Sequence, residues 1–172
     1  MQANPNLRQA LGHFATGVTI ITSRDAAGQP VGVTVNSFNS VSLDPPLILW
    51  SLARRAYSFD TFASQRHFAV HILSAHQQFL SDRFARAGTD KFADIELDEG
   101  LGGTPLLSEC AAVLQCETEA RYDGGDHLIV LGRVLAYHTH ENPPLLFYRG
   151  RYAPPAIAHG LGYDGATHHS HP

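Results

Sequence analysis

Cysteine is scarce in this chain, and so is every feature that marks a secreted or membrane-spanning protein. Only two of the 172 residues are cysteines, Cys110 and Cys116, and two are too few for a disulfide framework. No apolar run approaches the roughly 18 residues that cross a bilayer, and the first residues lack the charged and then apolar layout of a signal peptide. We therefore expect a reduced, cytoplasmic protein without a membrane partner.

Charge is also sparse and nearly balanced. Charged residues make up 16% of the chain and the formal net charge is -4, which argues against nucleic acid as a partner. Hydrophobic residues make up 44% of 172 residues, which is enough for one globular domain with a full core. We place this domain at residues 1–156 and predict a disordered tail, rich in Gly and His, at residues 157–172.

Familiar catalytic motifs are missing as well. No Gly-x-Gly-x-x-Gly follows a predicted strand, so a Rossmann nucleotide site is not indicated. The histidines of the tail have no fixed ligand spacing, so we expect no metal site. Ser23, Ser51, Cys110 and Cys116 have no partner that the sequence assigns, and none of them is a candidate nucleophile.

The hydrophobic pattern predicts a mainly β fold with a few peripheral helices. Asn6 is the expected N-cap of a first helix, which Gly17 ends, and residues 88–105 have a weak pattern that indicates a surface excursion. Short hairpins favour a closed antiparallel barrel over a doubly wound sheet. The predicted strands are 18–22, 31–38, 47–52, 68–73, 111–122, 128–137 and 145–148, and two more helices are expected at 58–64 and 76–87.

The stretch from Thr34 to Pro46 carries the densest row of small polar side chains. It is expected to begin as a strand and to end in the rigid turn Asp44-Pro45-Pro46. Hydroxyl and amide groups interleaved with backbone N–H and C=O groups suit the edge of a flat polar heterocycle better than bond cleavage. The alternative is an edge strand with solvated hydroxyls. The side chains in question are Thr34, Asn36, Ser37, Ser40 and Ser42.

A second polar group follows the strand at 47–52. Ser51 stands at the strand end, Arg54 and Arg55 come next, and Ser58 is placed to cap a helix. The free N–H groups of a helix start and a guanidinium together can bind phosphate. The alternative is a solvated basic loop.

Two histidines merit separate interpretations. His127 follows Gly125 and Asp126 in a hairpin loop, where an imidazole could hydrogen-bond a carboxamide or transfer a proton. It could equally pin the hairpin to a neighbouring segment. His71 alternates with Val70 and Ile72 on a strand, and the pattern favours a satisfied interior or rim histidine.

In sequence order, these pieces resemble the short-chain flavin reductases of two-component monooxygenases, in the flavin-reductase-like family of FMN-binding split barrels. The resemblance covers roughly residues 7–153, and its specificity comes from the ordered series of motifs. The matching pieces are Phe14 to Thr22, Gly32 to Pro46, Phe68 to Leu73, Gly125-Asp126-His127, Pro143 to Leu146 and Arg149 to Tyr152.

The resemblance implies a Greek-key split β-barrel that forms a homodimer, with flavin near the subunit interface. It also implies hydride transfer from NADH or NADPH to FMN or FAD, and release of reduced flavin to a separate monooxygenase. His71 departs from the family, which commonly has Asn there.

The resemblance also implies roles for individual residues. His127 is expected on the nicotinamide side as the catalytic residue, and Tyr152 near the site. The residues expected along the isoalloxazine ring are Thr34, Asn36, Ser37 and Phe38, with Ser40 close by, and those expected at the phosphate are Ser51, Arg55 and Ser58.

Two other functions stay open at this point. One is a non-enzymatic flavin- or haem-binding barrel that serves storage or sensing. The other is a pyridoxal-type phosphate oxidase, which shares the split barrel but needs a basic cluster for a second phosphate. The chain has 12 Lys and Arg residues in all, grouped only at Arg54-Arg55 and Arg149-Arg151, which favours the reductase.

Overall fold

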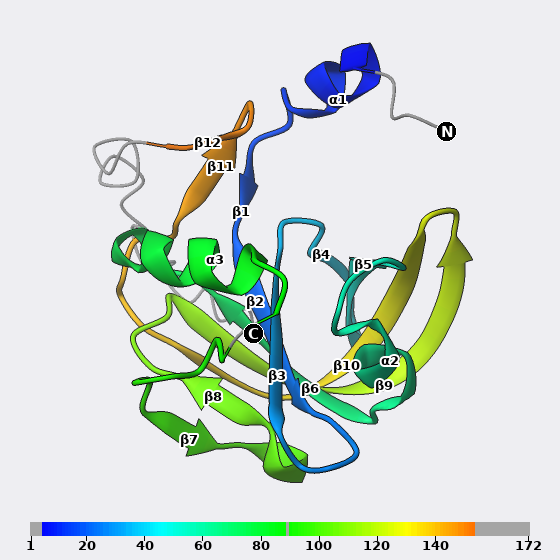
Figure 1. The fold of residues 1–172 in the computed structure, drawn as a ribbon, viewed down its shortest axis with the longest axis vertical. Coiled ribbons are helices and arrows are strands. Elements are labelled where there is room, and N and C mark those ends of the chain that lie inside the picture. Colours follow the sequence, from blue (N-terminus) through cyan, green and yellow to red (C-terminus); the bar gives the residue numbers. More distant parts are fainter. Residues whose placement is uncertain (1–4, 89, 154–172) are drawn as a thin grey trace, which may run out of the picture.

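The computed structural model describes residues 5–88 and 90–153 and confirms the mainly β prediction (Figure 1). The predicted tail at 157–172 lies outside the described residues. Three helices are present: α1 (Pro5–Leu11), α2 (Phe59–Ser64) and α3 (Gln78–Ala85). The strands are β1 (Thr16–Gly17), β2 (Thr19–Arg24), β3 (Pro30–Val35), β4 (Asn39–Leu43), β5 (Pro46–Ala53), β6 (His67–Ile72), β7 (Leu97–Glu99), β8 (Pro105–Leu107), β9 (Ala112–Gly124), β10 (His127–Thr139), β11 (Leu146–Tyr148) and β12 (Arg151–Tyr152).

Seven strands form the main sheet in the order β3-β2-β6-β9-β10-β5-β4, and every pairing is antiparallel. The two edge strands, β3 and β4, follow each other in the sequence and are joined only by residues 36–38. The sheet therefore has to curl until its two edges approach. Register shifts in the β9–β10 and β4–β5 pairs help, because bulges bend and twist strands. The result is a split barrel.

The β9–β10 hairpin ends in a two-residue turn that follows from its sequence. His127 pairs with Gly124, which leaves Gly125 and Asp126 as the central residues. Gly125 has a φ of 71°, the left-handed conformation that a II′ hairpin turn requires at its first central position. The turn fixes His127 as the first residue of β10, next to Ala53 of β5.

Both faces of the sheet are buried, because successive residues of a strand point to opposite sides. On β2, Ile20 belongs to a cluster with Leu80 and Phe84 of α3, and Ile21 belongs to a second cluster that contains Trp50. Helix α3 covers the first cluster, whereas the second fills the barrel. This arrangement explains why Thr19 to Ser23 are all buried.

A small separate sheet, β1-β11-β12, carries α1 away from the barrel (Figure 1). The predicted first helix is too long: α1 ends at Leu11, and Thr16–Gly17 is a strand. Asn6 lies inside α1, so the predicted N-cap is wrong. The apolar stripe of this helix does not pack on the barrel, since Leu11 is 66% and Phe14 is 79% exposed.

Residues 88–105 differ from the predicted surface excursion. β7 pairs with β8, and this two-stranded sheet extends over Leu97 to Leu107. Phe92 and Leu107 are buried in the cluster under α3. The segment is therefore part of the core wall. In the described part of the chain, no helix is long and apolar enough to cross a membrane.

Candidate functional site

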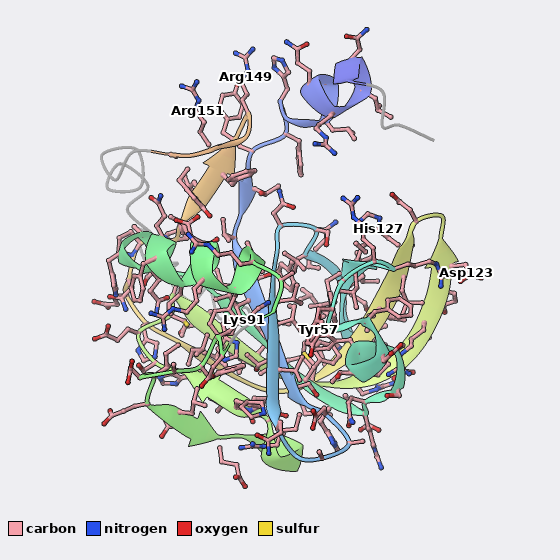
Figure 2. All side chains as sticks on the ribbon, viewed as in Figure 1. Tyr57, Lys91, Asp123, His127, Arg149 and Arg151 are labelled. Carbon is pink, nitrogen blue, oxygen red and sulfur yellow. The ribbon has the colours of Figure 1, made fainter. Side chains whose placement is uncertain are left out.

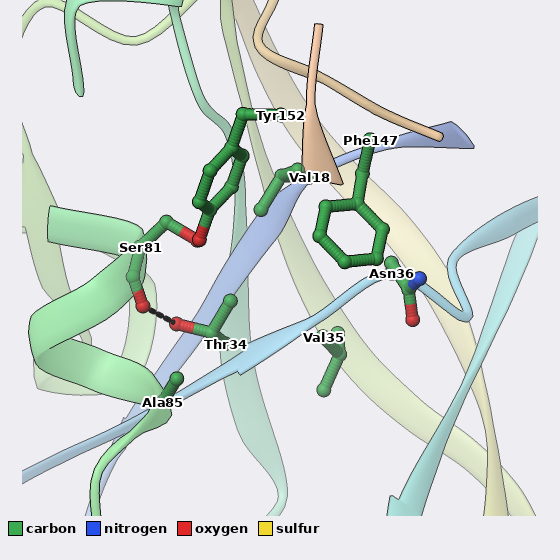
Figure 3. A pocket seen from close by; sticks show the side chains of 8 residues that line it. All are labelled: Val18, Thr34, Val35, Asn36, Ser81, Ala85, Phe147 and Tyr152. Carbon is green, nitrogen blue, oxygen red and sulfur yellow. Dashed lines mark hydrogen bonds between the residues drawn. The ribbon is translucent and has the colours of Figure 1, made fainter. Parts of the chain in front are cut away.

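A cavity of about 210 Å³ lies where the main sheet, α3 and the β11–β12 hairpin meet (Figure 3). We call it the Tyr152 cavity. Figure 3 shows Phe147 and Tyr152 on one side and Ser81 and Ala85 of α3 on another. Its lining residues are Val18, Thr34, Val35, Asn36, Ser81, Ala85, Phe147 and Tyr152. Three predicted cofactor-binding residues, Thr34, Asn36 and Tyr152, thus meet in one place.

Hydrogen bonds fix the walls of this cavity. The Thr34 hydroxyl donates to the Ser81 carbonyl at 2.7 Å, so that this side chain holds β3 against α3. The Tyr152 hydroxyl lies 2.8 Å from the Ser81 hydroxyl and donates to the Asp82 carboxylate at 3.0 Å. Burial is the main cause that raises the Tyr152 pKa, so the phenol stays protonated. Sequence reasoning missed Ser81 and Phe147, which no local motif marks.

Ser37 binds residues 36–38, which connect β3 to β4, to strand β5. Its hydroxyl accepts the Ser51 N–H at 2.9 Å and donates to the Ser51 carbonyl at 3.1 Å. The pairing of β4 with β5 begins at Asn39 and Leu49, so the Ser37 side chain takes the place of a backbone partner for Ser51. Two predicted site residues are joined here, and the Ser37 hydroxyl keeps one free lone pair.

His127 lies at the β9–β10 turn (Figure 2), where Arg54 of the β5–α2 loop donates to the Gly125 carbonyl and its backbone N–H donates to the Asp126 carbonyl. The Nδ1–H of His127 donates to Asp126 Oδ1 over 2.7 Å, which leaves Nε2 as the atom that can meet a ligand. This hydrogen bond is the main cause that lowers the Asp126 pKa, and the charge of Arg55 adds to it.

The two arginines of the β5–α2 loop have different surroundings. Arg54 forms an ion pair with Asp123 and lies over the Phe59 ring. None of the ion pairs in the described residues includes Arg55. Arg55 therefore has no ion-pair partner in the described residues, and its role at a phosphate stays a prediction from the resemblance.

Ser58 occupies its predicted position at the start of a helix, but its side chain does not play the predicted capping role. It stands at the N-cap position of α2, but its side chain makes no capping hydrogen bond. Instead it lines a second cavity, of about 100 Å³, together with Tyr57 and Lys91 (Figure 2). Arg55 does not line this cavity.

Lys91 is a cation that sequence reasoning left without a role. Its Nζ donates to the carbonyls of Gly32 at 3.1 Å and Phe84 at 2.9 Å. Burial lowers its pKa from the usual value, and one of its three N–H groups keeps no partner in these bonds. The cavity is small and offers the fixed cation of Lys91, and its lining also includes the carboxylate of Asp90.

The remaining predicted residues are more dispersed. Phe38 packs against the barrel core, and Ser40 is an exposed residue of β4 opposite Ile48. His71 is fully buried and is an interior histidine, as its strand pattern predicted. Burial lowers the His71 pKa to about 4, which excludes it from proton transfer at neutral pH.

The site fits a flavin in the kind of groups that it offers. Among the described strands β3 pairs only with β2, so it is an edge strand that presents N–H and C=O groups on its outer side, although Lys91 already binds its Gly32 carbonyl. Small hydroxyls and an amide flank this edge, and the small cavity at Lys91 lies against Gly32 of the same strand. A planar polar ring with a phosphorylated side chain could therefore lie along β3.

Comparison with known proteins places the chain in a family. The flavin reductase-like domain model matches residues 11–156. The chain is 44% identical over 147 residues to "FMN reductase (NADH) SmoA" of Agrobacterium fabrum, covering 86% of this chain and 83% of that protein. It is 43% identical over 152 residues to "Probable flavin reductase" of Rhizobium meliloti, which covers 88% of this chain but only 49% of that protein. The chain thus spans about half the length of this relative.

A solved structure gives the same result for the fold. The styrene monooxygenase flavin reductase (SMOB) from Pseudomonas putida S12 superposes with a TM-score of 0.79 at 34% identity, covering 86% of this chain and 95% of that one. Sequence, fold and polar edge therefore agree, and the chain belongs to the family of flavin reductase-like domains.

Proposed function

We propose that this protein is a flavin reductase that uses a reduced nicotinamide to reduce FMN or FAD. The observation that carries the proposal is the end of β3, an edge strand of the main sheet, where Thr34 and the following Asn36 line the Tyr152 cavity. Hydride transfer is chemistry that the nicotinamide and the flavin supply themselves. The chain has to bind both rings, align them and stabilise charge.

The polar edge would bind and orient the flavin ring. Free backbone groups of β3 and the amide of Asn36 can hydrogen-bond its pyrimidine edge. Ser37 contributes less directly, because its hydroxyl already donates one hydrogen bond to Ser51 and accepts another from it. Its role is to keep the edge in place. Weakly polar donors suit this task, since no strong acid or base is needed at the reacting atoms.

The phosphate of the flavin would lie in the Lys91 cavity. Ser58 supplies a hydroxyl and Lys91 supplies a cation. This cavity lies at the start of β3, whereas the Tyr152 cavity lies at its end. Arg55 lies near Asp126 and His127, and we place it with His127 on the nicotinamide side of the site. His127 Nε2 would accept or donate a hydrogen bond to the carboxamide of the nicotinamide, with Asp126 fixing the ring orientation.

The proposed electron donor is NADH, because the SmoA relative carries that name. The proposed acceptor of reduced flavin is a separate monooxygenase, as the name of the SMOB structure suggests. We also propose a homodimer in the cytoplasm. The exposed apolar side chains of Leu7, Leu11 and Phe14 support it, because a contiguous apolar surface usually marks an interface.

The test is anaerobic mixing of the purified protein with NADH or NADPH and with FMN or FAD. The proposal expects the visible absorbance of the flavin to bleach with at least one pair. Absence of bleaching with all four pairs would reject it. Retention of flavin without any turnover would instead support a binding or storage protein, and turnover of a pyridoxine phosphate would support the oxidase.

A further inference from the structure

A third and larger cavity, of about 410 Å³, lies at the base of the segment that carries α1. We call it the Arg149 cavity. It shares Asn36 and Phe147 with the Tyr152 cavity, so the two adjoin. No carboxylate lines it. The lining residues are Arg8, Leu11, Gly12, Phe14, Thr16, Asn36, Phe147, Arg149 and Gly150.

Two guanidinium groups border this cavity without a counter-ion. Neither Arg8 nor Arg149 takes part in any ion pair of the described residues, and no side-chain hydrogen bond engages either group there. Four other arginines of the described residues, Arg24, Arg54, Arg66 and Arg133, do form ion pairs. Arg133, for example, binds both carboxylate oxygens of Glu119, at 2.9 and 3.0 Å. Two arginines without an ion-pair partner in the lining of one cavity are a candidate site for an oxyanion.

The backbone at Arg149 adopts a conformation that is unfavourable for arginine. Its φ is 50°, and Gly150 follows with a φ of 78°. The left-handed region suits Gly or Asn, and other residues adopt it at a conformational cost. The Arg149 N–H donates to the Gly12 carbonyl at 2.9 Å, which holds the turn against the end of α1. Tyr148 pairs with Arg151, so Arg149 and Gly150 are the central residues of a two-residue turn that requires positive φ at both positions, and the turn fixes where the Arg149 side chain starts.

We propose that Arg8 and Arg149 bind the diphosphate of a dinucleotide substrate that extends from the Tyr152 cavity into the Arg149 cavity. The proposal rests on the reductase function above. A diphosphate offers oxygens to two guanidinium groups at once, whereas FMN has only one phosphate, for which the Lys91 cavity is the candidate. NADH and FAD both contain the diphosphate, and the experiment separates them.

The decisive variant is Arg149→Asn, because Asn removes the charge and adopts the left-handed conformation more easily than Arg. Arg8→Gln tests the other cation. Arg151→Gln is the matched control, since Arg151 lies on the same hairpin but lines neither cavity (Figure 2). Binding of NAD⁺, FAD and FMN is measured directly by fluorescence titration, and the NADH KM is measured with FMN as acceptor.

For a diphosphate site, Arg149→Asn and Arg8→Gln each weaken binding of a dinucleotide by about tenfold, while FMN affinity stays within about twofold and thermal stability of Arg149→Asn does not fall. A higher NADH KM and weaker NAD⁺ binding assign the site to the nicotinamide. Weaker FAD binding with unchanged NAD⁺ binding assigns it to FAD.

The proposal is overturned if both variants match Arg151→Gln for NAD⁺ and FAD. It is also overturned if FMN binding falls as much as dinucleotide binding, because the site would then hold a single phosphate. These titrations require no turnover, so they are independent of the bleaching test. A wild-type protein that binds dinucleotides at Arg149 but does not bleach flavin would refute the reductase function alone.

Discussion

The Nε2 atom of His71 accepts a hydrogen bond from the backbone N–H of Leu107 at 3.1 Å, in the middle of the protein core. The opposite ring nitrogen, Nδ1, lies 3.1 Å from the Ile20 carbonyl. Because a carbonyl can only accept, Nδ1 carries the proton and the ring is neutral. A single imidazole thus joins β2, β6 and β8 through two buried backbone groups.

This geometry predicts acid sensitivity. Burial lowers the His71 pKa from 6.5 to about 4, so the unfolded chain binds a proton that the folded chain resists. The stabilisation is complete above about pH 6.5 and is lost as the pH falls toward about 4, by an amount on the order of 3 kcal/mol. Denaturant unfolding at several pH values measures it. His71→Asn removes the titrating group, and a pH dependence as steep as that of the wild type would contradict the assignment.

Gly32 is expected to tolerate no side chain. A Cβ at this position would lie 2.5 Å from Phe84 Cε1, so Gly32→Ala has to displace a buried ring and should cost about 1–3 kcal/mol of unfolding free energy. Gly17→Ala is the control, because a Cβ there has no atom within 4 Å, and its expected change is within about 0.5 kcal/mol. Equal effects of the two substitutions in a denaturant titration would contradict this packing.

The two cysteines should be inert in the folded protein. Cys110 and Cys116 are buried, and burial raises the pKa of each thiol to about 12. Thiolate is the reactive form, so a colourless aromatic disulfide reagent should label neither thiol near neutral pH and should label both after denaturation. Rapid labelling of a native thiol would show that the core opens at that strand.

His127→Ala should weaken use of the nicotinamide more than use of the flavin. The expected result is an increase of about tenfold in the KM for NADH with little change in flavin affinity, because one hydrogen bond is lost at the ligand. Asp126→Asn should have a smaller effect of the same kind, since Asp126 acts only by orienting the His127 ring. Equal weakening of NADH and flavin binding would contradict the assignment of His127 to the nicotinamide side.

Ser37→Ala should loosen the β3–β4 connection. It removes both hydrogen bonds to Ser51 and should cost about 1 kcal/mol of stability, with weaker flavin binding as the second effect. Thermal unfolding and flavin titration measure the two separately. Unchanged flavin affinity at reduced stability would place the flavin away from this connection.

The sequence predicted the fold class because most strands have a strong local signal. β2, β5, β9 and β10 consist of β-branched or alternating apolar residues, and short turns connect neighbouring antiparallel strands. β4 was missed, because Asn39, Ser40 and Ser42 look like loop residues. Only the pairing with β5 makes this polar segment a strand, and pairing over a distance is not visible in a local window.

The site was predicted in part. Thr34, Asn36 and Tyr152 do meet in one cavity, although Tyr152 is more than 100 residues away from the other two in sequence. That grouping came from the ordered motifs and not from spacing. Ser81 and Lys91 were not predicted. The Ser81 carbonyl binds Thr34 of β3, and the half-buried Lys91 ammonium group binds Gly32 of the same strand. Such contacts depend on how α3 and the following segment pack, which a local sequence pattern does not show.

One consequence of the barrel core concerns light. Trp50 is the only tryptophan of the chain, it has no exposed surface, and the rings of Phe62 and Phe68 enclose it at centroid distances of 5.2 and 5.8 Å. It is adjacent in sequence to Ser51, beside the split of the barrel. Its ultraviolet emission overlaps flavin absorption, so a flavin seated there would quench it by energy transfer. Fluorescence of Trp50 therefore reports directly how much flavin is bound.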